Sequence, residues 1–409
     1  MGEKMSWFER LKRGEIGEFT PGDESFPPFL AGGEGVFLEL TDRRRVTDFT
    51  SGFGVALSGH SPSFVQEEAA KGFYHGLGDY VPNRFKVELL ERLGSLLGGG
   101  MKGMLLGNGA DGVEAALRSA SLFRKSRRMA AFEGAYHGTS LGALSVTHSP
   151  RFREKWEERL PFETDFFPYH EEGLLSLEKA LKEKRYGAVI LEPIQGRGGV
   201  RVPTPSFHRT LRRITEETGT PLIFDEVFTG FWKSGRLFAK DLFGVDPDLI
   251  VLGKALTSAF PLSVCFGNSR IMDAAWPEGD REASYTLTFS GNPFFCRVAL
   301  RHLEILLRPE TAGKVAFVES FLRRELQALA SRNPERVRQV RGTGLMWALE
   351  PVSPTLVMPL INRLLEKHSI LLPLTSSLGE ALEMVPSYTM PEEELVRLIG
   401  ALEESLRAL

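Results

Sequence analysis

The hydrophobic residues between positions 61 and 290 fall into short apolar runs separated by longer amphipathic segments. Short apolar runs are typical of strands buried on both faces, and apolar residues every three or four positions are typical of helices. The runs predict strands at 104–106, 129–132, 188–191, 222–224, 249–252 and 263–266, and the segments predict helices that include 113–123, 174–183 and 206–217. This alternation predicts an α/β domain in which helices cover both faces of a mostly parallel sheet.

Both ends of the chain show a different pattern. Residues 35–49 alternate apolar and polar positions around the turn-prone pair Thr41-Asp42, which predicts a hairpin. After residue 294, a long amphipathic helical region is followed by strand-like stretches at 340–350 and 382–385. We therefore expect three parts: an N-terminal segment (1–60) that packs with the small domain, a large domain (61–295), and a small C-terminal α+β domain (296–409).

Composition narrows the class of protein. The chain has 409 residues, 42% hydrophobic and 25% charged, which is typical of an ordinary globular protein. With 50 basic and 53 acidic residues, its charge gives no reason to expect nucleic acid or an anionic membrane as a partner. No apolar run approaches the roughly 18 residues of a membrane-spanning helix. Cys265 and Cys296 are the two cysteines and form no CxxC pair, so we expect no disulfide, no metal site and a cytoplasmic location.

Three predicted strands end on ionisable residues. Glu192 follows 188–191, Asp225 follows 222–224, and Lys254 follows 249–252 after one glycine. Each side chain alone is more often a helix cap or a surface charge. Because they are about one β-α unit apart, parallel strands would bring all three to the same edge of the sheet. A partly desolvated lysine at that edge is a candidate Schiff-base nucleophile.

Two other strand ends carry groups that suit a cofactor. Asn108-Gly109-Ala110 lies between a predicted strand and a predicted helix, where backbone N–H groups and the helix dipole can bind a phosphate. Tyr136 follows another strand and offers a flat ring for stacking. A capped turn and a buried structural tyrosine are the alternative interpretations. A stacked ring, a phosphate site and a lysine opposite an aspartate together describe a site for pyridoxal 5′-phosphate.

Eight stretches of the chain, in this order, resemble the class III (ω-amino acid type) aminotransferases, fold type I enzymes that use pyridoxal phosphate. They are GVFLELTDRRRVTDFTSG, GNGADGVEAAL, FEGAYHG, LEPIQGRGGV, IFDEVFTGFWKSG, PDLIVLGKAL, TFSGNP and VRGTGLMWALE. The resemblance spans about residues 35–394. It implies a transaminase that moves an amino group between a primary, ω-type amine or amino acid and a 2-oxo acid or related carbonyl.

The resemblance also implies roles for individual residues. Lys254 forms the aldimine with the cofactor and moves a proton, Asp225 pairs with the pyridine nitrogen, and Glu192 orients the substrate side or the surroundings of Asp225. Thr288 is similar to a threonine that reaches the phosphate of the neighbouring subunit, which implies a homodimer with shared active sites. The other implied cofactor contacts are Gly109, Ala110, Tyr136, His137, Val227 and Phe228.

Several positions depart from the family pattern. Asn108-Gly109-Ala110 replaces Ser-Gly-Ser/Thr, so a hydroxyl is lost while the backbone donors remain. Phe228 replaces a glutamine, and Thr139 stands where members that bind a carboxylate often have arginine. Arg197 replaces a glutamate and either binds a substrate carboxylate or points outward. Phe53 falls at an apolar substrate wall. We expect Phe53, Thr139 and Arg197 to contact substrate in a pocket less polar than usual.

Three alternatives stay open. One is an aminomutase of the glutamate-1-semialdehyde type, which shares the fold and the lysine but releases no free 2-oxo acid. The stretches YHGTSLGALSV and LEMVPSYTMPEEEL resemble diaminopelargonate synthase, but 372–374 lacks the arginine of that enzyme. The last alternative is an inactive pyridoxal-phosphate-binding scaffold, against which the retention of Lys254, Asp225 and Glu192 argues.

Overall fold

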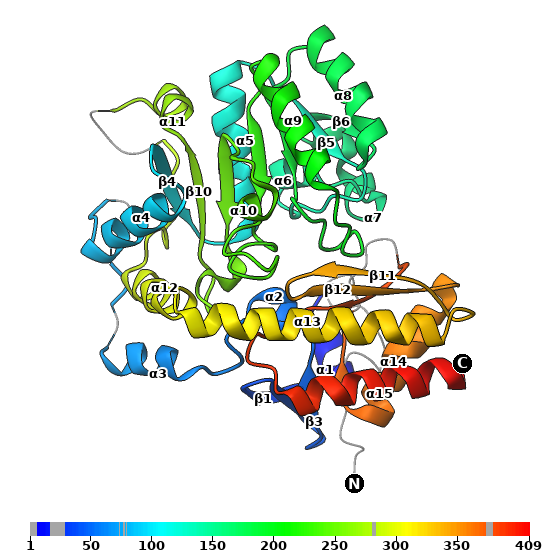
Figure 1. Cartoon of the computed structure of the whole chain (residues 1–409). Helices are drawn as coiled ribbons and strands as arrows, with labels where there is room; N and C mark the ends of the chain where they lie inside the picture. Colours follow the sequence, from blue (N-terminus) through cyan, green and yellow to red (C-terminus); the bar gives the residue numbers. More distant parts are fainter. Residues whose placement is uncertain are drawn as a thin grey trace.

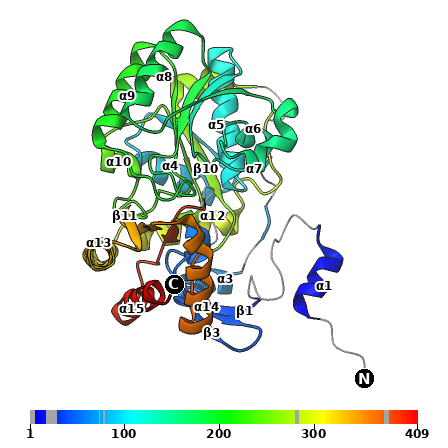
Figure 2. The same cartoon turned by 90° about the vertical axis from the view of Figure 1, so that its right-hand side faces the viewer.

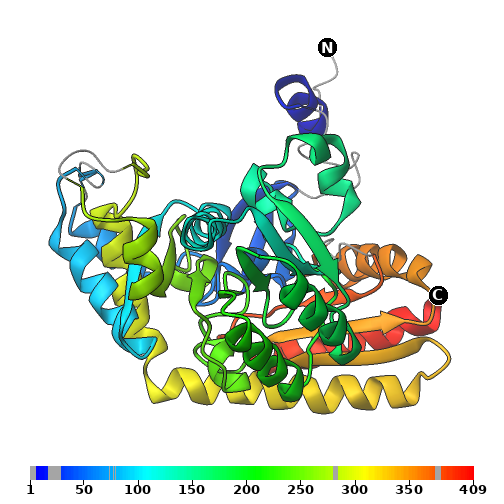
Figure 3. The same cartoon turned by 90° about the horizontal axis from the view of Figure 1, so that it is seen from above.

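The chain folds into a large lobe around a seven-stranded sheet and a smaller lobe built from both ends of the sequence (Figure 1). The computed structural model describes residues 6–16, 29–72, 74–76, 78, 80–279, 284–373 and 379–409. Leu374, part of the arginine-free stretch, lies outside these residues. Helix α13 (Pro309–Arg332) runs along the boundary between the lobes (Figures 1 and 3).

The large sheet has the strand order β4-β10-β9-β8-β7-β5-β6. Only β10 runs antiparallel to its neighbours, so the prediction of a mostly parallel sheet is confirmed. Its strands are β4 (Met101–Leu106), β5 (Arg128–Phe132), β6 (Glu163–Phe167), β7 (Ala188–Leu191), β8 (Leu222–Asp225), β9 (Leu249–Leu252) and β10 (Ser263–Asn268). Strand β6 was not predicted, because this edge strand begins with three polar residues and lacks a continuous apolar run.

Helices cover both faces of this sheet. Alternate sheet residues such as Ile223 and Val251 face α5 (Gly109–Arg124), while their neighbours Phe224 and Ile250 face the side of α8 (Glu171–Glu183) and α9 (Pro205–Glu217). The other helices of this lobe are α4 (Arg84–Leu96), α6 (Leu141–Ser145), α7 (Pro150–Arg153), α10 (Ala239–Phe243), α11 (Ser269–Ala275) and α12 (Pro293–Leu306). The central strands β7, β8 and β9 are therefore buried on both faces, as continuous apolar runs require.

The small lobe joins the two ends of the chain. The predicted hairpin is present as β2 (Phe37–Leu40) and β3 (Arg45–Asp48), and β3 pairs in parallel with β13 (Ile370–Leu371). The hydroxyl of Thr47 donates a hydrogen bond of 2.7 Å to Glu394, near the C-terminus. The remaining elements are α1 (Trp7–Gly14), β1 (Leu30–Glu34), α2 (Ser51–Gly54), α3 (Ser63–Ala70), β11 (Val337–Thr343), β12 (Met346–Pro351), α14 (Val357–His368), β14 (Leu382–Met384) and α15 (Glu392–Ala408).

Helix α1 is set apart from both lobes (Figure 2). The boundaries 1–60, 61–295 and 296–409 stay predictions, although the pairing of β3 with β13 agrees with a small domain that draws on both termini. Within the described part of the chain, no helix combines the length and apolar character needed to cross a membrane.

Candidate active site

A cavity of about 450 Å³ opens at the carboxyl edge of the large sheet. Its walls come from the loops that follow β4, β5, β7, β8 and β9, where an open α/β sheet binds its ligands. Most of the predicted site residues line it: Gly109, Ala110, Tyr136, His137, Thr139, Glu192, Arg197, Asp225, Val227, Phe228 and Lys254. The topology thus brings together residues that are more than 140 positions apart in the sequence.

Two predicted residues lie outside the cavity lining. The side chain of Phe53 is 60% exposed on α2, and Thr288 is exposed in the loop before α12. Conversely, Val55 and the stretch 259–262 line the cavity and were not predicted. The stretch follows Lys254 closely and could have been found from that position, whereas nothing in the local sequence distinguishes Val55.

Lys254 begins the turn after β9, with its backbone in the left-handed region at a φ of 45°. Burial lowers the pKa of its amine to about 8, although the negative charges of Asp225 and Glu192 oppose this effect. Its Nζ lies 4.4 Å from the centre of the Phe228 ring. The amine therefore has an appreciable neutral fraction near neutral pH, as a lysine nucleophile requires.

Asp225, at the end of β8, is buried and hydrogen-bonded on both carboxylate oxygens. Oδ2 accepts a hydrogen bond of 2.7 Å from Nδ1 of His137, and Oδ1 accepts one of 3.0 Å from the N–H group of Val227. Nε2 of His137 has no hydrogen-bond partner among the described residues. The carboxylate is thus held in one orientation at the floor of the cavity, where it can face a cationic group.

Glu192, at the end of β7, connects two loops that line the cavity. Its carboxylate accepts hydrogen bonds of 2.9 Å from the N–H group of Tyr136 and 2.9 Å from that of Gly196. Burial raises the pKa of Glu192 to about 7, and the nearby charge of Asp225 adds to this rise while His137 opposes it. Glu192 thereby fixes the loop of Tyr136 and the loop that carries Arg197 relative to each other.

Arg197 lies over aromatic rings within the cavity lining. Its guanidinium carbon is 4.5 Å from the centre of the Tyr136 ring and 5.3 Å from that of Phe152. The two rings meet edge to face at 5.4 Å. Stacking of this kind orients a guanidinium without using its hydrogen-bond donors. Arg197 therefore belongs to the cavity wall, with its planar group over the Tyr136 ring.

The loop before α5 has the features of a phosphate site. Asn108 caps the helix through the N–H group of Asp111, at 3.2 Å, and the Asp111 carboxylate accepts the N–H group of Asn108 in return. Helix geometry leaves the N–H groups of Gly109 and Ala110 without intrahelical acceptors. A Cβ atom on Gly109 would lie 2.7 Å from Val227, so only glycine allows this close approach.

Phe228 is enclosed by two glycines. A Cβ atom on Gly196 would lie 2.5 Å from the Phe228 ring, and one on Gly54 would lie 3.1 Å from it. The ring therefore occupies space that only glycine leaves open on both sides. It makes this wall of the cavity apolar, as the sequence predicts.

Two buried charged residues near the cavity were missed. Glu383, on β14, is 3% exposed, and its charge raises the pKa of Lys254 against the effect of burial. Lys233 is fully buried, and burial lowers its pKa well below the usual range. Its Nζ has no hydrogen-bond partner among the described residues. A polar residue inside an otherwise apolar run, as in Ala381-Leu382-Glu383-Met384, was the available signal for Glu383.

The residues present fit pyridoxal phosphate: a lysine with a lowered pKa, an opposed buried carboxylate, an aromatic ring and free backbone donors at a helix N-terminus share one cavity. The fold and this site define an enzyme that uses this cofactor on a fold type I scaffold.

Comparisons with known proteins identify the family. Residues 19–406 match the family described as Aminotransferase class-III. The chain is 30% identical to the acetylornithine aminotransferase of Methanosarcina mazei, over 93% of this chain and 92% of that protein. It is also 30% identical to the LysW-aminoadipate semialdehyde transaminase of Deinococcus radiodurans, over 98% of this chain and 90% of that protein. The ornithine aminotransferase of Toxoplasma gondii superposes with a TM-score of 0.85 at 25% identity, covering 98% of this chain and 94% of that one. The chain belongs to the class III aminotransferases.

Membership confirms four of the predictions made from the sequence. The fold is that of the fold type I enzymes, the cofactor is pyridoxal 5′-phosphate, the protein is an enzyme, and its reaction is transamination. The roles of the individual site residues stay predictions.

Proposed function

We propose that the protein transfers an amino group between a primary amine, carried on an ω-carbon, and a 2-oxo acid or related carbonyl, with Lys254 as the catalytic lysine. The observation that carries this proposal is the half-buried amine of Lys254, with a pKa lowered to about 8, at the sheet edge that also holds Asp225 and Glu192. The names of the compared proteins specify acetylornithine, aminoadipate semialdehyde and ornithine, which supports an amine with an amino-acid-like chain.

The chain offers a partner for each part of the cofactor. Gly109 and Ala110 would donate backbone N–H groups to the phosphate, Asp225 would accept a hydrogen bond from the protonated pyridine nitrogen and keep it protonated, and Tyr136 and Val227 would flank the ring. When bound, the cofactor supplies a carbonyl carbon that bonds amines and a ring that withdraws electrons from the reacting carbon. His137 donates to Asp225 and so keeps that carboxylate turned towards the ring nitrogen.

Lys254 would have a second role as a proton carrier. An amine with a pKa near 8 can take up and release a proton at neutral pH, so its Nζ would remove the proton from the substrate carbon that bears the amino group. The Phe228 ring, 4.4 Å from Nζ, covers one side of the amine with an apolar surface. Glu192 holds the Tyr136 loop and thus the position of the ring.

The substrate end of the pocket is assigned to three residues. Arg197 binds a substrate carboxylate by donating hydrogen bonds from its planar guanidinium, and its position over Tyr136 in the cavity lining supports this. Thr139 lines the same cavity without adding charge. Phe53, which is exposed on α2 outside the cavity lining, is assigned as an apolar contact for a substrate that extends beyond the cavity.

We also propose that the protein is a homodimer with shared active sites and that it is located in the cytoplasm. Thr288 and Phe289 are exposed in the single chain, which supports a loop offered to the partner's cofactor. Mixing inactive Lys254→Ala and Thr288→Ala subunits should restore about a quarter to a half of the activity of the same amount of native protein. In each mixed dimer, one of the two sites then combines a native Lys254 with a native Thr288 from the other subunit. The two free, buried cysteines support a reducing compartment.

The decisive experiment follows the amino group. Purified protein with bound cofactor is mixed with ω-amines, and the loss of the visible absorption of the lysine-bound cofactor and the release of a free carbonyl product are measured. Lys254→Ala should abolish both, while Lys184→Ala, on a surface loop, should change neither. Activity that survives Lys254→Ala would refute the assignment, and turnover without any free 2-oxo acid would indicate an aminomutase instead.

A further inference from the structure

Residues Ser51 to Gly54 form a turn with a left-handed backbone. Their φ angles are 45° at Ser51, 55° at Gly52, 59° at Phe53 and 75° at Gly54. Single left-handed residues are common only for glycine, and a run that includes a serine and a phenylalanine is unfavourable in isolation. The turn, α2 in Figure 1, lies where the lobes meet. Contacts from the surrounding structure must therefore hold it in place.

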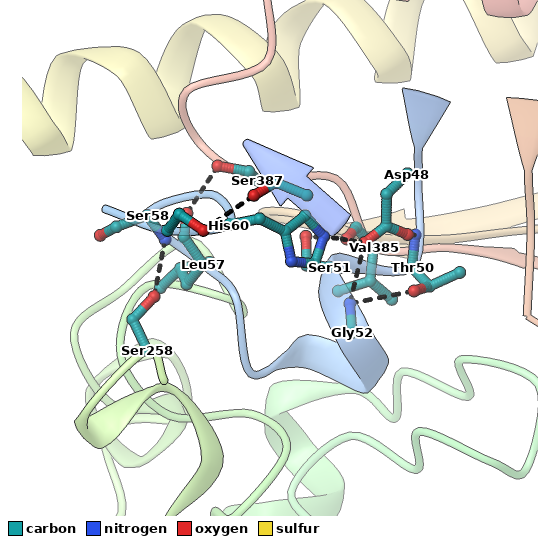
Figure 4. Close-up of polar contacts among 12 residues, drawn as sticks. Asp48, Thr50, Ser51, Gly52, Leu57, Ser58, His60, Ser258, Val385 and Ser387 are labelled. Carbon is teal, nitrogen blue, oxygen red and sulfur yellow. Dashed lines mark hydrogen bonds and ion pairs between the residues drawn. The ribbon is translucent and has the colours of Figure 1, made fainter. Parts of the chain in front are cut away.

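Asp48 makes one of these contacts and also binds the residue before the turn. Its buried carboxylate accepts hydrogen bonds from the N–H group of Thr50 at 2.7 Å and from that of Gly52 at 3.0 Å. Nε2 of His60, on the other side of the loop, donates to the same carboxylate at 2.8 Å (Figure 4). The hydrogen bond between Asp48 and His60 thus joins the two ends of the loop 48–60, which contains the turn.

The turn is also tied to both lobes. The hydroxyl of Ser51 donates to the carbonyl oxygen of Val385 at 2.7 Å, next to β14. Beyond the turn, the N–H group of Ser58 donates to the hydroxyl of Ser258 in the large lobe at 3.0 Å (Figure 4). Movement of the turn would therefore disturb contacts on both sides of the lobe boundary.

The turn reaches the active site through two contacts. Val55, the next residue, lines the cavity. A Cβ atom on Gly54 would lie 3.1 Å from the Phe228 ring and 3.3 Å from the side chain of Lys233. Since the Phe228 ring lies 4.4 Å from Nζ of Lys254, a single residue separates the turn from the catalytic amine.

We propose that Asp48 and His60 are positioning residues of the active site: they hold the left-handed turn so that Val55 and Phe228 form a fixed apolar wall beside Lys254. The wall limits the size of the group that fits beside the reacting amine, and so it selects the amine substrate. This inference rests on the proposed function of the cavity.

His60→Ala removes the hydrogen bond to Asp48, and His60→Gln keeps a donor for Asp48. His368→Ala is the matched control, because His368 lies on α14 and is 3.8 Å from its own carboxylate partner, Glu404. In the holoenzyme we expect His60→Ala to raise KM about tenfold for an amine that fits the native wall, with less than a threefold change in kcat, the order expected for loss of one hydrogen bond to a charged group. His60→Gln should restore KM to within about threefold, and His368→Ala should leave it unchanged.

A second readout does not depend on activity. Hydrogen exchange in the peptide 49–60 should speed up about tenfold in His60→Ala, because the N–H group of Gly52 is bonded to the carboxylate that His60 holds. If His60→Ala does not fold, Gly52→Ala provides the same test. A Cβ atom there meets nothing closer than 3.9 Å, so only the left-handed backbone is disfavoured.

Unchanged exchange and unchanged KM in His60→Ala, or in Gly52→Ala where His60→Ala does not fold, would overturn the inference. Equal losses in His60→Ala and His60→Gln would also overturn it, because the donor would then be irrelevant. Failure of the proposed function is recognised separately, since Lys254→Ala would then keep its activity whatever the His60 variants do.

Discussion

Nδ1 of His137 lies 2.7 Å from Oδ2 of Asp225, and both side chains are buried in the floor of the cavity. An imidazole that donates to a carboxylate fixes which oxygen of that carboxylate stays available to a ligand.

The first prediction concerns this pair. His137→Phe keeps a flat ring but removes the donor, which should weaken cofactor binding about tenfold to a hundredfold, as expected for a lost hydrogen bond of about 1.5–3 kcal/mol to a charged group. Titration of the apoprotein with cofactor measures this. His137→Asn, whose amide can replace Nδ1, should lose much less. Equal affinities in the native protein and His137→Phe would show that the pair has no role in holding the cofactor.

A second prediction concerns pH. Burial lowers the pKa of Lys254 to about 8, and Glu383 is one of the acids that oppose this shift. Because only the neutral amine attacks a carbonyl carbon, the rate at which the apoprotein takes up the cofactor should rise with pH and level off above the pKa. Glu383→Gln removes a negative charge and should move the midpoint of this profile to lower pH.

The same shift affects stability. Between pH 8 and 10.5 the folded protein binds fewer protons at Lys254 than the unfolded chain does. Lys254 therefore lowers the free energy of unfolding below pH 8, and this loss disappears as the pH rises through this range.

The control for the cofactor-uptake experiment is Glu380→Gln, three residues from Glu383 and with its carboxylate 3.7 Å from Arg201. A midpoint that moves equally in both variants, or in neither, would contradict a specific effect of Glu383.

The third prediction concerns substrate charge. Arg197→Ala should weaken binding of substrates that carry a carboxylate by about 2–4 kcal/mol, because a buried charge then loses its partner. Amines without a carboxylate should be affected little. The ratio of kcat/KM for a matched pair of donors, one with and one without a carboxylate, measures the difference. An equal loss for both donors would place the effect of Arg197 on the Tyr136 ring rather than on the substrate.

A fourth prediction tests the packing around Phe228. Gly196→Ala places a methyl group 2.5 Å from the ring, and overpacking of this kind costs about 1–3 kcal/mol. We expect a lower melting temperature and a raised KM for amines. The double variant Gly196→Ala with Phe228→Leu should recover part of both, since the smaller side chain leaves room. No recovery in the double variant would mean that the methyl group acts on a different neighbour.

The parts of the fold that were predicted share one physical cause. Strands buried on both faces have continuous apolar runs, so β7, β8 and β9 were recognisable, and their parallel order placed Glu192, Asp225 and Lys254 at one edge. The edge strand β6 is half exposed and has no such run. The positions of the glycines did not predict the left-handed turn. Hydrogen bonds of Asp48 with Gly52 and His60 hold this strained backbone, and the hydrophobic pattern of the sequence contains no sign of them. Glu383 reaches the site from β14, far along the chain, so only the tertiary structure shows it.

The pairing of β3 with β13 has a consequence for how the chain is made. Thr47 pairs with Ile370, so strands β1 to β3 leave the ribosome first but gain their last neighbour only after more than 300 further residues. Synthesis completes the seven strands of the large lobe in that interval, and domains generally fold as units as they emerge. The edge of β3 therefore stays open throughout, and long-range closure of this kind is slow. The parallel partner of β3 is therefore missing until residues 370 and 371 have been made.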